Sequence, residues 1–322
     1  MRYILISFVL FFSCTSKYEN KLEVYRFDIE LFNSDSITIK DNLKYWNSKH
    51  ASFMQMFSDE IMQKGRMSSN EYTKQLLSFI NHPDMREAFD STLIIFSDIS
   101  KIEQNLANSF AIYNNLFPEY PTPKVIACFN GFNYAVSSYE DNIVVGFEHF
   151  LGKDSRFYSY LGLPEYIRFQ KQNRFILPNI MEVLYSHNFQ DTIKDDLLSE
   201  IIHKGKIMYF IDQLLPNFSL ADKIRYSEKE IDWVKDNESY IWSSLIENNM
   251  LFSSFKPEFR SFLEYAPFSK IISRKAPSRI AYYIGYRIIK SYVKHNDVAI
   301  HDLVKTQDAR LILNKSKYKP QK

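Results

Sequence analysis

Residues 195–215, DDLLSEIIHKGKIMYFIDQLL, repeat apolar side chains at intervals of three and four. This spacing places the apolar residues on one broad face of a helix. Asp195 and Asp196 precede them, and carboxylates are favourable beside the positive end of the helix dipole. The segment therefore predicts a helix that starts at the aspartates and packs against a core. Its apolar face consists of Leu197, Leu198, Ile201, Ile202, Met208, Ile211 and Leu215.

Two more segments toward the C-terminus have the same helical periodicity. SEKEIDWVKDNESYIWSSLIENNMLF starts with Ser227 and Glu230, which have the spacing of a capping box. Residues 277–296 start with Pro277, and proline is tolerated in a first helical turn. Gly285 lies in the middle of this segment and costs about 1 kcal/mol relative to alanine. We therefore expect a second backbone to approach closely there.

The N-terminal and central parts differ in how their apolar residues are spaced. Residues 41–115 have helical spacing and end at the breaker cluster PEYPTP, residues 118–123. Residues 124–152 then alternate short β-branched and aromatic runs with turn residues, including Asn130-Gly131. This pattern predicts two or three antiparallel strands. The fold class expected is α+β, mainly helical, with a small antiparallel sheet followed by helices.

The predicted organisation is a single mainly helical globular domain. Its limits are residues 23–312, with an N-terminal helical part at 23–120, the sheet at 121–150 and C-terminal helices at 165–312. Residues 313–322 are basic and are expected to form a frayed tail.

The composition is that of a globular protein with a large aromatic core. The chain has 322 residues, of which 45% are hydrophobic, and these include 27 Phe and 22 Tyr. The net charge of +2 gives no reason to expect nucleic acid as a partner. Cys128 lies in an apolar run and is expected to be a buried, unpaired thiol.

The N-terminus predicts a lipid anchor. MRYILISFVLFFSC, residues 1–14, has one arginine, an apolar run too short to span a bilayer, and a small residue before Cys14. Phe11 is bulkier than the usual residue at its position in a lipobox. We expect residues 1–13 to be a lipoprotein signal peptide and 14–22 a lipidated tether that joins the membrane through Cys14. The alternative is an ordinary secretory signal, with Cys14 incidental.

The sequence motifs of common catalytic sites are missing. No two of the seven histidines are four residues apart, so His-Glu-x-x-His does not occur. Glu200 and His203 have the spacing of a carboxylate di-iron motif, but such sites need a second copy, and a polar helix flank is the alternative. No nucleophile elbow or phosphate-binding glycine loop occurs, and Cys128 has no base near it in sequence. We therefore predict no catalytic residue, no metal and no cofactor.

Five segments carry a resemblance that covers nearly the whole chain. They are FNGFNYAVSSYEDNIVVGFEHFLGKDSRFY, LGLPEYIRFQ, LLSEIIHKGKIMYFIDQLLP, YIWSSLIENNMLFSS and RKAPSRIAYYIGYRIIKSYV. With the lipobox, they resemble the GldB family of gliding motility lipoproteins of Bacteroidetes. The resemblance implies a cell-envelope lipoprotein that is required for gliding and faces the periplasm. Its implied partners are other envelope proteins of the gliding and type IX secretion machinery.

The order of elements is also similar to predicted zinc-dependent proteases, a gluzincin-like scaffold. That resemblance implies that Glu182 keeps the general-base position of the metal motif. Met181 and Tyr185 then replace the two imidazoles, and Lys204 stands where a third ligand is expected. A thioether, a phenol and an ammonium do not hold zinc at these positions. The implied protein is therefore not an enzyme but a peptidase-like scaffold without the His-Glu-x-x-His motif.

Three functional hypotheses follow. The first is a non-enzymatic component of the gliding machinery, whose cleft holds a partner segment along the strand near residues 143–147. The second is an envelope metallopeptidase-like hydrolase with an unconventional site. The third is a structural lipoprotein whose aromatic surface packs against other proteins.

Overall fold

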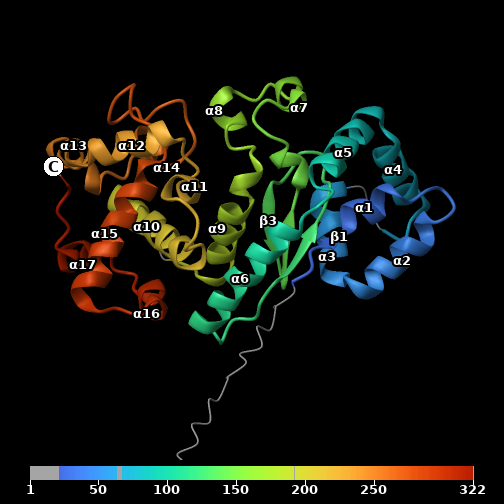
Figure 1. Cartoon of the computed structure of the whole chain (residues 1–322), viewed down its shortest axis with the longest axis horizontal. Helices are drawn as coiled ribbons and strands as arrows, with labels where there is room; N and C mark the ends of the chain where they lie inside the picture. The colour runs from blue at the N-terminus through green and yellow to red at the C-terminus, as the bar shows by residue number, and fades with distance from the viewer. Residues whose placement is uncertain (1–21, 64–66, 192, 322) are drawn as a thin grey trace, which may run out of the picture.

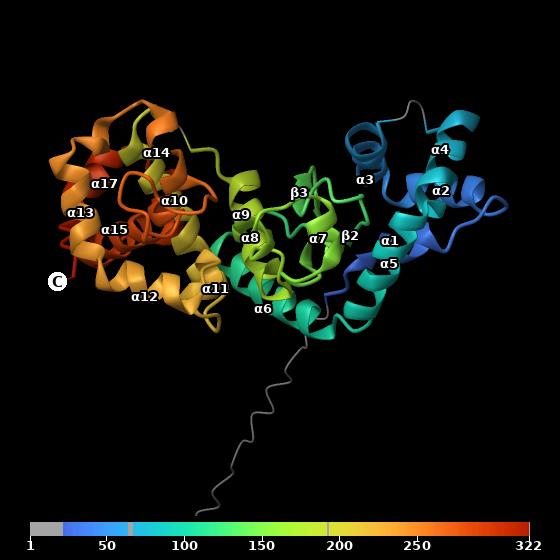
Figure 2. The same ribbon diagram turned by 90° about the horizontal axis from the view of Figure 1, so that it is seen from above.

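The computed structural model describes residues 22–63, 67–191 and 193–321. Helices contain 62% of the residues and strands 5%, which confirms the mainly helical α+β class. The sheet lies in the middle of an elongated molecule, with N-terminal helices on one side and C-terminal helices on the other (Figures 1 and 2). The predicted signal peptide and Cys14 lie outside the described residues.

The N-terminal part is a group of short helices that follow the first strand. The elements are β1 (Tyr25–Arg26), α1 (Phe27–Phe32), α2 (Ile39–Lys49), α3 (Ala51–Met56), the π-helix η1 (Phe57–Met62), α4 (Asn70–Asn81), α5 (Pro83–Ile95) and α6 (Ser100–Leu116). They include the helical segments expected at residues 41–115. Ser69 caps α4 by accepting a hydrogen bond from the backbone of Tyr72, and Pro83 occupies the first position of α5.

The sheet is mixed, with four strands in the order β1-β2-β4-β3. β2 (Lys124–Ala127) is parallel to β1 and β4 (Asn142–Val145), whereas β3 (Val136–Tyr139) is antiparallel to β4. The antiparallel prediction is thus confirmed for β3 and β4 and wrong for β2. The chain crosses from β2 to the outer strand β3, and the hairpin then brings β4 back beside β2 in the same direction. Asn130-Gly131 lies in that crossing segment.

The two central strands of the sheet, β2 and β4, are buried on both faces and join two hydrophobic clusters. Alternate side chains of each strand point to opposite faces, so β2 and β4 contribute to both clusters. The cluster with the C-terminal helices takes Val125, Ala127, Ile143 and Val145, and the cluster with the N-terminal helices takes Ile126, Cys128 and Val144. This double burial explains why these strands are continuous apolar runs.

The rest of the chain forms short helices next to the sheet and then the helices of the C-terminal bundle. The elements are the 3₁₀ helix η2 (Phe147–Phe150), α7 (Arg156–Tyr160), α8 (Glu165–Arg168), η3 (Asn173–Phe175), α9 (Ile176–Asn188), α10 (Leu197–Leu214), α11 (Leu220–Ile224), α12 (Glu228–Asp236), α13 (Glu238–Glu247), η4 (Met250–Phe252), α14 (Lys256–Leu263), α15 (Ile280–Asn296), α16 (Ile300–Lys305) and α17 (Ala309–Ser316). Asp196 caps α10, and Ser227 and Glu230 form the predicted capping box.

Helices α10 and α15 cross with their backbones in contact at two glycines. A Cβ atom on Gly285 would lie 2.1 Å from the carbonyl oxygen of Ile201 and 2.7 Å from the nitrogen of Gly205. A Cβ atom on Gly205 would lie 2.4 Å from the carbonyl carbon of Gly285. The close approach of a second backbone, which was expected at Gly285, is therefore confirmed, and the helix that approaches is α10.

Two boundaries in this half differ from the predictions. Helix α15 begins at Ile280 rather than Pro277, because Arg279 has a left-handed backbone conformation that a right-handed helix cannot include. The C-terminal residues are not a frayed tail. α17 continues to the buried Ser316, and the Tyr318 hydroxyl donates a 2.8 Å hydrogen bond to Glu238, a fully buried carboxylate on α13.

Replacing either crossing glycine should separate α10 from α15. We expect Gly285→Ala to lower the free energy of unfolding by about 3 kcal/mol, because the methyl group meets rigid backbone atoms. Gly162→Ala is the control. It meets nothing within 4 Å and should cost only about 1 kcal/mol for its positive φ. Urea unfolding followed by circular dichroism measures both values, and equal stabilities of the two variants would contradict the close crossing.

Candidate functional site

A pocket of about 860 Å³ lies among α9, α10, α14 and α15. We call it the Glu182 pocket. It contains Glu182 and Lys204, two of the residues placed in the zinc-protease motif by resemblance, and also Glu200. The side chains that dominate its chemistry are Glu182, Glu200, Lys204, Arg225, Arg279 and Tyr282.

The carboxylate of Glu182 is fully engaged by its neighbours. Arg225 donates a charge-assisted hydrogen bond to Oε2, and the Tyr282 hydroxyl donates a 2.6 Å bond to Oε1. Nη2 of Arg279 lies 3.7 Å from Oε2. Burial opposes ionisation, but the guanidiniums of Arg225 and Arg279 outweigh it and hold the pKa of Glu182 well below its ordinary range. Glu182 is thus a permanent anion that anchors two buried cations.

Both arginines lie at helix ends in the left-handed region of backbone conformation. Arg225 follows α11 with φ +68°, and Arg279 precedes α15 with φ +60°. Only 2% of each residue is exposed. Residues other than glycine adopt this conformation at an energetic cost, which the surrounding contacts must outweigh.

Those contacts fix both guanidiniums in the floor of the pocket. Arg225 Nη1 donates a 2.8 Å hydrogen bond to the Asn179 side chain, and Arg279 Nη1 donates a 2.7 Å bond to the Ile224 carbonyl. The guanidinium of Arg279 also lies 3.9 Å from the ring centre of Tyr282 and 4.4 Å from that of Tyr265. Such stacking is a favourable cation–π geometry.

Met181 and Tyr185, the other two positions of the expected metal motif on α9, do not line the pocket. Met181 is completely buried in the core, and the Tyr185 hydroxyl donates a 2.9 Å hydrogen bond to Asp191. The structure thus joins Glu182 to Lys204 in one pocket and places Met181 and Tyr185 elsewhere.

The Glu200–His203 pair does not converge on one point. Nδ1 of His203 lies 2.6 Å from Asp191, which also accepts a 2.7 Å hydrogen bond from Lys206. Glu200 lies on the pocket side, 3.9 Å from the ammonium of Lys256. Across the part of the chain that the structure describes, no group of three or more His, Cys, Asp and Glu residues has the geometry to hold a metal ion. His203 and Glu200 therefore contact different partners within the bundle, a hydrogen bond with Asp191 for the first and the ammonium of Lys256 for the second.

Cys128 is a core residue, as predicted. Its thiol is buried in the N-terminal cluster, and burial raises its pKa well above the ordinary value. A thiol is a poor nucleophile in such surroundings, because the reactive form is the thiolate.

The Gly146-Phe-Glu-His segment is a structural joint at the ends of the parallel strands. Glu148 accepts backbone hydrogen bonds from Asn130 at 2.7 Å and Phe132 at 3.4 Å, which ties the loop after β2 to the segment after β4. Gly146 is required there, since a Cβ atom would lie 2.6 Å from the Tyr134 carbonyl oxygen. Burial raises the pKa of Glu148 to about 8 and lowers that of His149 to about 3. These shifts follow from the enclosure of both side chains, which are 0% and 5% exposed.

The strand proposed to hold a partner peptide is not an edge strand. β4 is hydrogen-bonded to β2 on one side and to β3 on the other along its whole length. The hypothesis that a peptide lies along residues 143–147 is therefore wrong, because backbone pairing already uses both edges of this strand.

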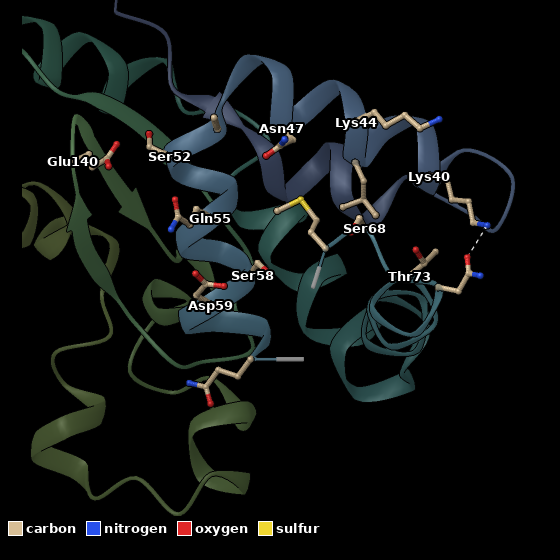
Figure 3. A pocket seen from close by; sticks show the side chains of 15 residues that line it. Lys40, Lys44, Asn47, Ser52, Gln55, Ser58, Asp59, Ser68, Thr73 and Glu140 are labelled. Atoms are coloured by element: carbon tan, nitrogen blue, oxygen red, sulfur yellow. Dashed lines mark hydrogen bonds between the residues drawn. The ribbon is translucent and has the colours of Figure 1, made fainter. Parts of the chain in front are cut away.

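A second pocket, of about 1310 Å³, lies among the N-terminal helices (Figure 3). Ser52, Gln55 and Asp59 line it from α3 and η1 on the side that faces Glu140, and half of its other lining residues carry amides or hydroxyls. Lys40 donates a 3.1 Å hydrogen bond to Asn70 at one side. Among the described residues, no ion pair joins its lysines to its carboxylates. This pocket is polar but lacks the buried charges of the Glu182 pocket.

Comparison with known families identifies the chain. The family model described as gliding motility protein GldB matches residues 13–320. The chain belongs to this family. The match includes Cys14 and every residue of the Glu182 pocket, and it confirms the resemblance carried by the five sequence segments. Comparisons with curated proteins and with solved structures gave no match. Over the described residues, no helix combines the length and the apolar character needed to cross a bilayer.

Three of the six side chains that dominate the chemistry of the pocket were not predicted from the sequence. Arg225, Arg279 and Tyr282 come from two helix ends and a helix face that are far from Glu182 in sequence. The left-handed conformation of the two arginines has no local signature, since neither is glycine or asparagine. The nearest signal was the unbroken helical pattern of residues 277–296, which gave a wrong start for α15.

Removing the charge of Glu182 should destabilise the fold. We expect Glu182→Gln to lower the free energy of unfolding by about 3 kcal/mol at neutral pH, because it leaves two buried guanidiniums without a carboxylate. Glu264→Gln is the matched control. It breaks an exposed ion pair with Arg260 at the same pocket and should have little effect. Chemical denaturation distinguishes them, and a Glu182→Gln protein as stable as the control would refute the anchoring role.

Proposed function

We propose that the chain is a cell-envelope lipoprotein required for gliding motility, in which it acts as a non-enzymatic component. The family match over residues 13–320 carries this proposal. The anchor is Cys14, and the folded part faces the periplasm. Its partners are other envelope proteins of the gliding and type IX secretion machinery.

The surroundings of the side chains that could perform catalysis favour a non-enzymatic role. Glu182, the expected general base, is held as a low-pKa anion by two guanidiniums and a phenol. A general base needs a pKa near the working pH and a lone pair directed at the substrate. Cys128 and His149 are enclosed, and burial disfavours the charged form of each. The groups described above thus suit structure and binding better than hydrolysis.

The lipid anchor can be tested in cells that glide. We expect Cys14→Ala to abolish fatty-acid labelling, to shift the protein from the membrane to the soluble fraction and to stop gliding. Acyl chains on one residue supply the membrane affinity, at about 0.8 kcal/mol per CH₂ group. Metabolic labelling, fractionation and single-cell tracking measure the three effects.

Cys128→Ala is the control for this experiment, because it removes the other cysteine while leaving the predicted anchor. It should keep labelling and membrane attachment. Gliding at the normal speed by a soluble Cys14→Ala protein, at normal cellular levels, would contradict the proposed role of the anchor.

The non-enzymatic proposal predicts the metal content of the full chain. Protein purified in detergent without chelator should contain substoichiometric zinc, and added zinc should not change its melting temperature. Inductively coupled plasma mass spectrometry measures the first quantity and thermal unfolding the second. One tightly held zinc per chain would instead favour the envelope hydrolase.

A further inference from the structure

The Glu182 pocket carries more positive than negative charge. Five basic side chains line it, against three carboxylates. The basic side chains are Lys204, Arg225, Lys256, Arg260 and Arg279, and the carboxylates are Glu182, Glu200 and Glu264. A partly desolvated pocket strengthens the attraction of such an excess for an anion.

Pairing within the pocket leaves Lys204 as the cation available to a ligand. Glu182 is shared by Arg225 and Arg279. Glu264 pairs with Arg260 at 2.7 Å, and Glu200 lies 3.9 Å from Lys256. Within the described residues, Lys204 forms no ion pair with a carboxylate. Its ammonium lies 5.4 Å from the ring centre of Tyr282.

Lys204 is also held in place by the closest helix contact of the fold. It precedes Gly205, whose backbone touches Gly285 on α15, and it is half-buried at the pocket. A lysine fixed on a rigid helix loses less conformational freedom on binding than one on a loop. The backbone of Lys204 is therefore fixed at the pocket, and its ammonium lies at the end of a side chain that can reach toward a ligand.

The other lining groups select among anions. Glu200 and Glu264 at the pocket would repel a ligand of high negative charge, such as a polyphosphate. Ile167, Pro257 and Leu263 add apolar surface beside Lys204. A single carboxylate attached to a chain with apolar side chains fits this mixture of charge and surface.

We propose that the Glu182 pocket binds a carboxylate of a peptide segment from a partner protein, with Lys204 as the principal cationic contact. The carboxylate is that of an Asp or Glu side chain or of a chain terminus. This assignment rests on the proposed function, because a component without chemistry acts by binding. It replaces the strand site, whose edges are occupied.

The test is selection of a random peptide display library on the full chain in detergent. Peptides that survive counter-selection against Lys204→Met should carry a carboxylate that they need for binding. Titration calorimetry should then show about tenfold or greater weakening with Lys204→Met, or when the carboxylate is amidated. Lys204→Arg should keep the affinity within a few fold, and Lys101→Met, on an exposed site of α6, should leave it unchanged.

Several outcomes would overturn the proposal. They are failure to enrich any peptide, equal binding by the amidated peptide, equal binding by Lys204→Met, and full displacement by millimolar inorganic phosphate. The last would assign the pocket to a free oxyanion. Circular dichroism of each variant establishes that it is folded. Failure here is separable from failure of the proposed function, because fatty-acid labelling and membrane attachment of the Cys14 and Cys128 variants do not depend on this pocket.

Discussion

The contact between Gly205 and Gly285 is the constraint on which the C-terminal half depends. Two helices whose backbones touch leave no room for a side chain at the crossing, so any Cβ atom there would force α10 and α15 apart. The same crossing sets the position of Lys204, one residue before Gly205, and of Tyr282, one turn before Gly285. The geometry of the pocket is therefore a consequence of how closely these helices pack.

The central sheet is the second constraint, because it is the shared wall of two cores. Each of β2 and β4 sends alternate side chains to the N-terminal and C-terminal clusters. A substitution in either strand would disturb the packing of both clusters, since close-packed interiors transmit changes in volume. Glu148 secures the ends of these strands by accepting backbone hydrogen bonds from the crossing loop. The Gly146-Phe-Glu-His segment thus has a role in holding the fold together.

The Glu182 pocket combines a structural charge cluster with a binding surface. Its floor is fixed by Glu182, Arg225 and Arg279, which are joined by ion pairs and hydrogen bonds, with both arginines buried. Its outer part holds Lys204 and mixed charges that remain accessible. A rigid floor below an accessible cation is an arrangement that favours recognition, because the cost of ordering the site is met during folding. Reactivity requires the opposite, a group whose charge can change during the reaction.

The sequence by itself determined the mainly helical class, the position of the sheet, the helix start at Asp195 and Asp196, the capping box at Ser227, and the close approach at Gly285. These features depend on local periodicity, on capping chemistry or on the missing side chain of one residue. Its segments also indicated the family, and its N-terminus predicted the anchor at Cys14. Only the tertiary structure decided the parallel pairing of β2, the left-handed Arg279 and the convergence of Glu182 with Arg225. Those features arise from contacts between residues distant in sequence, and local patterns do not encode such contacts.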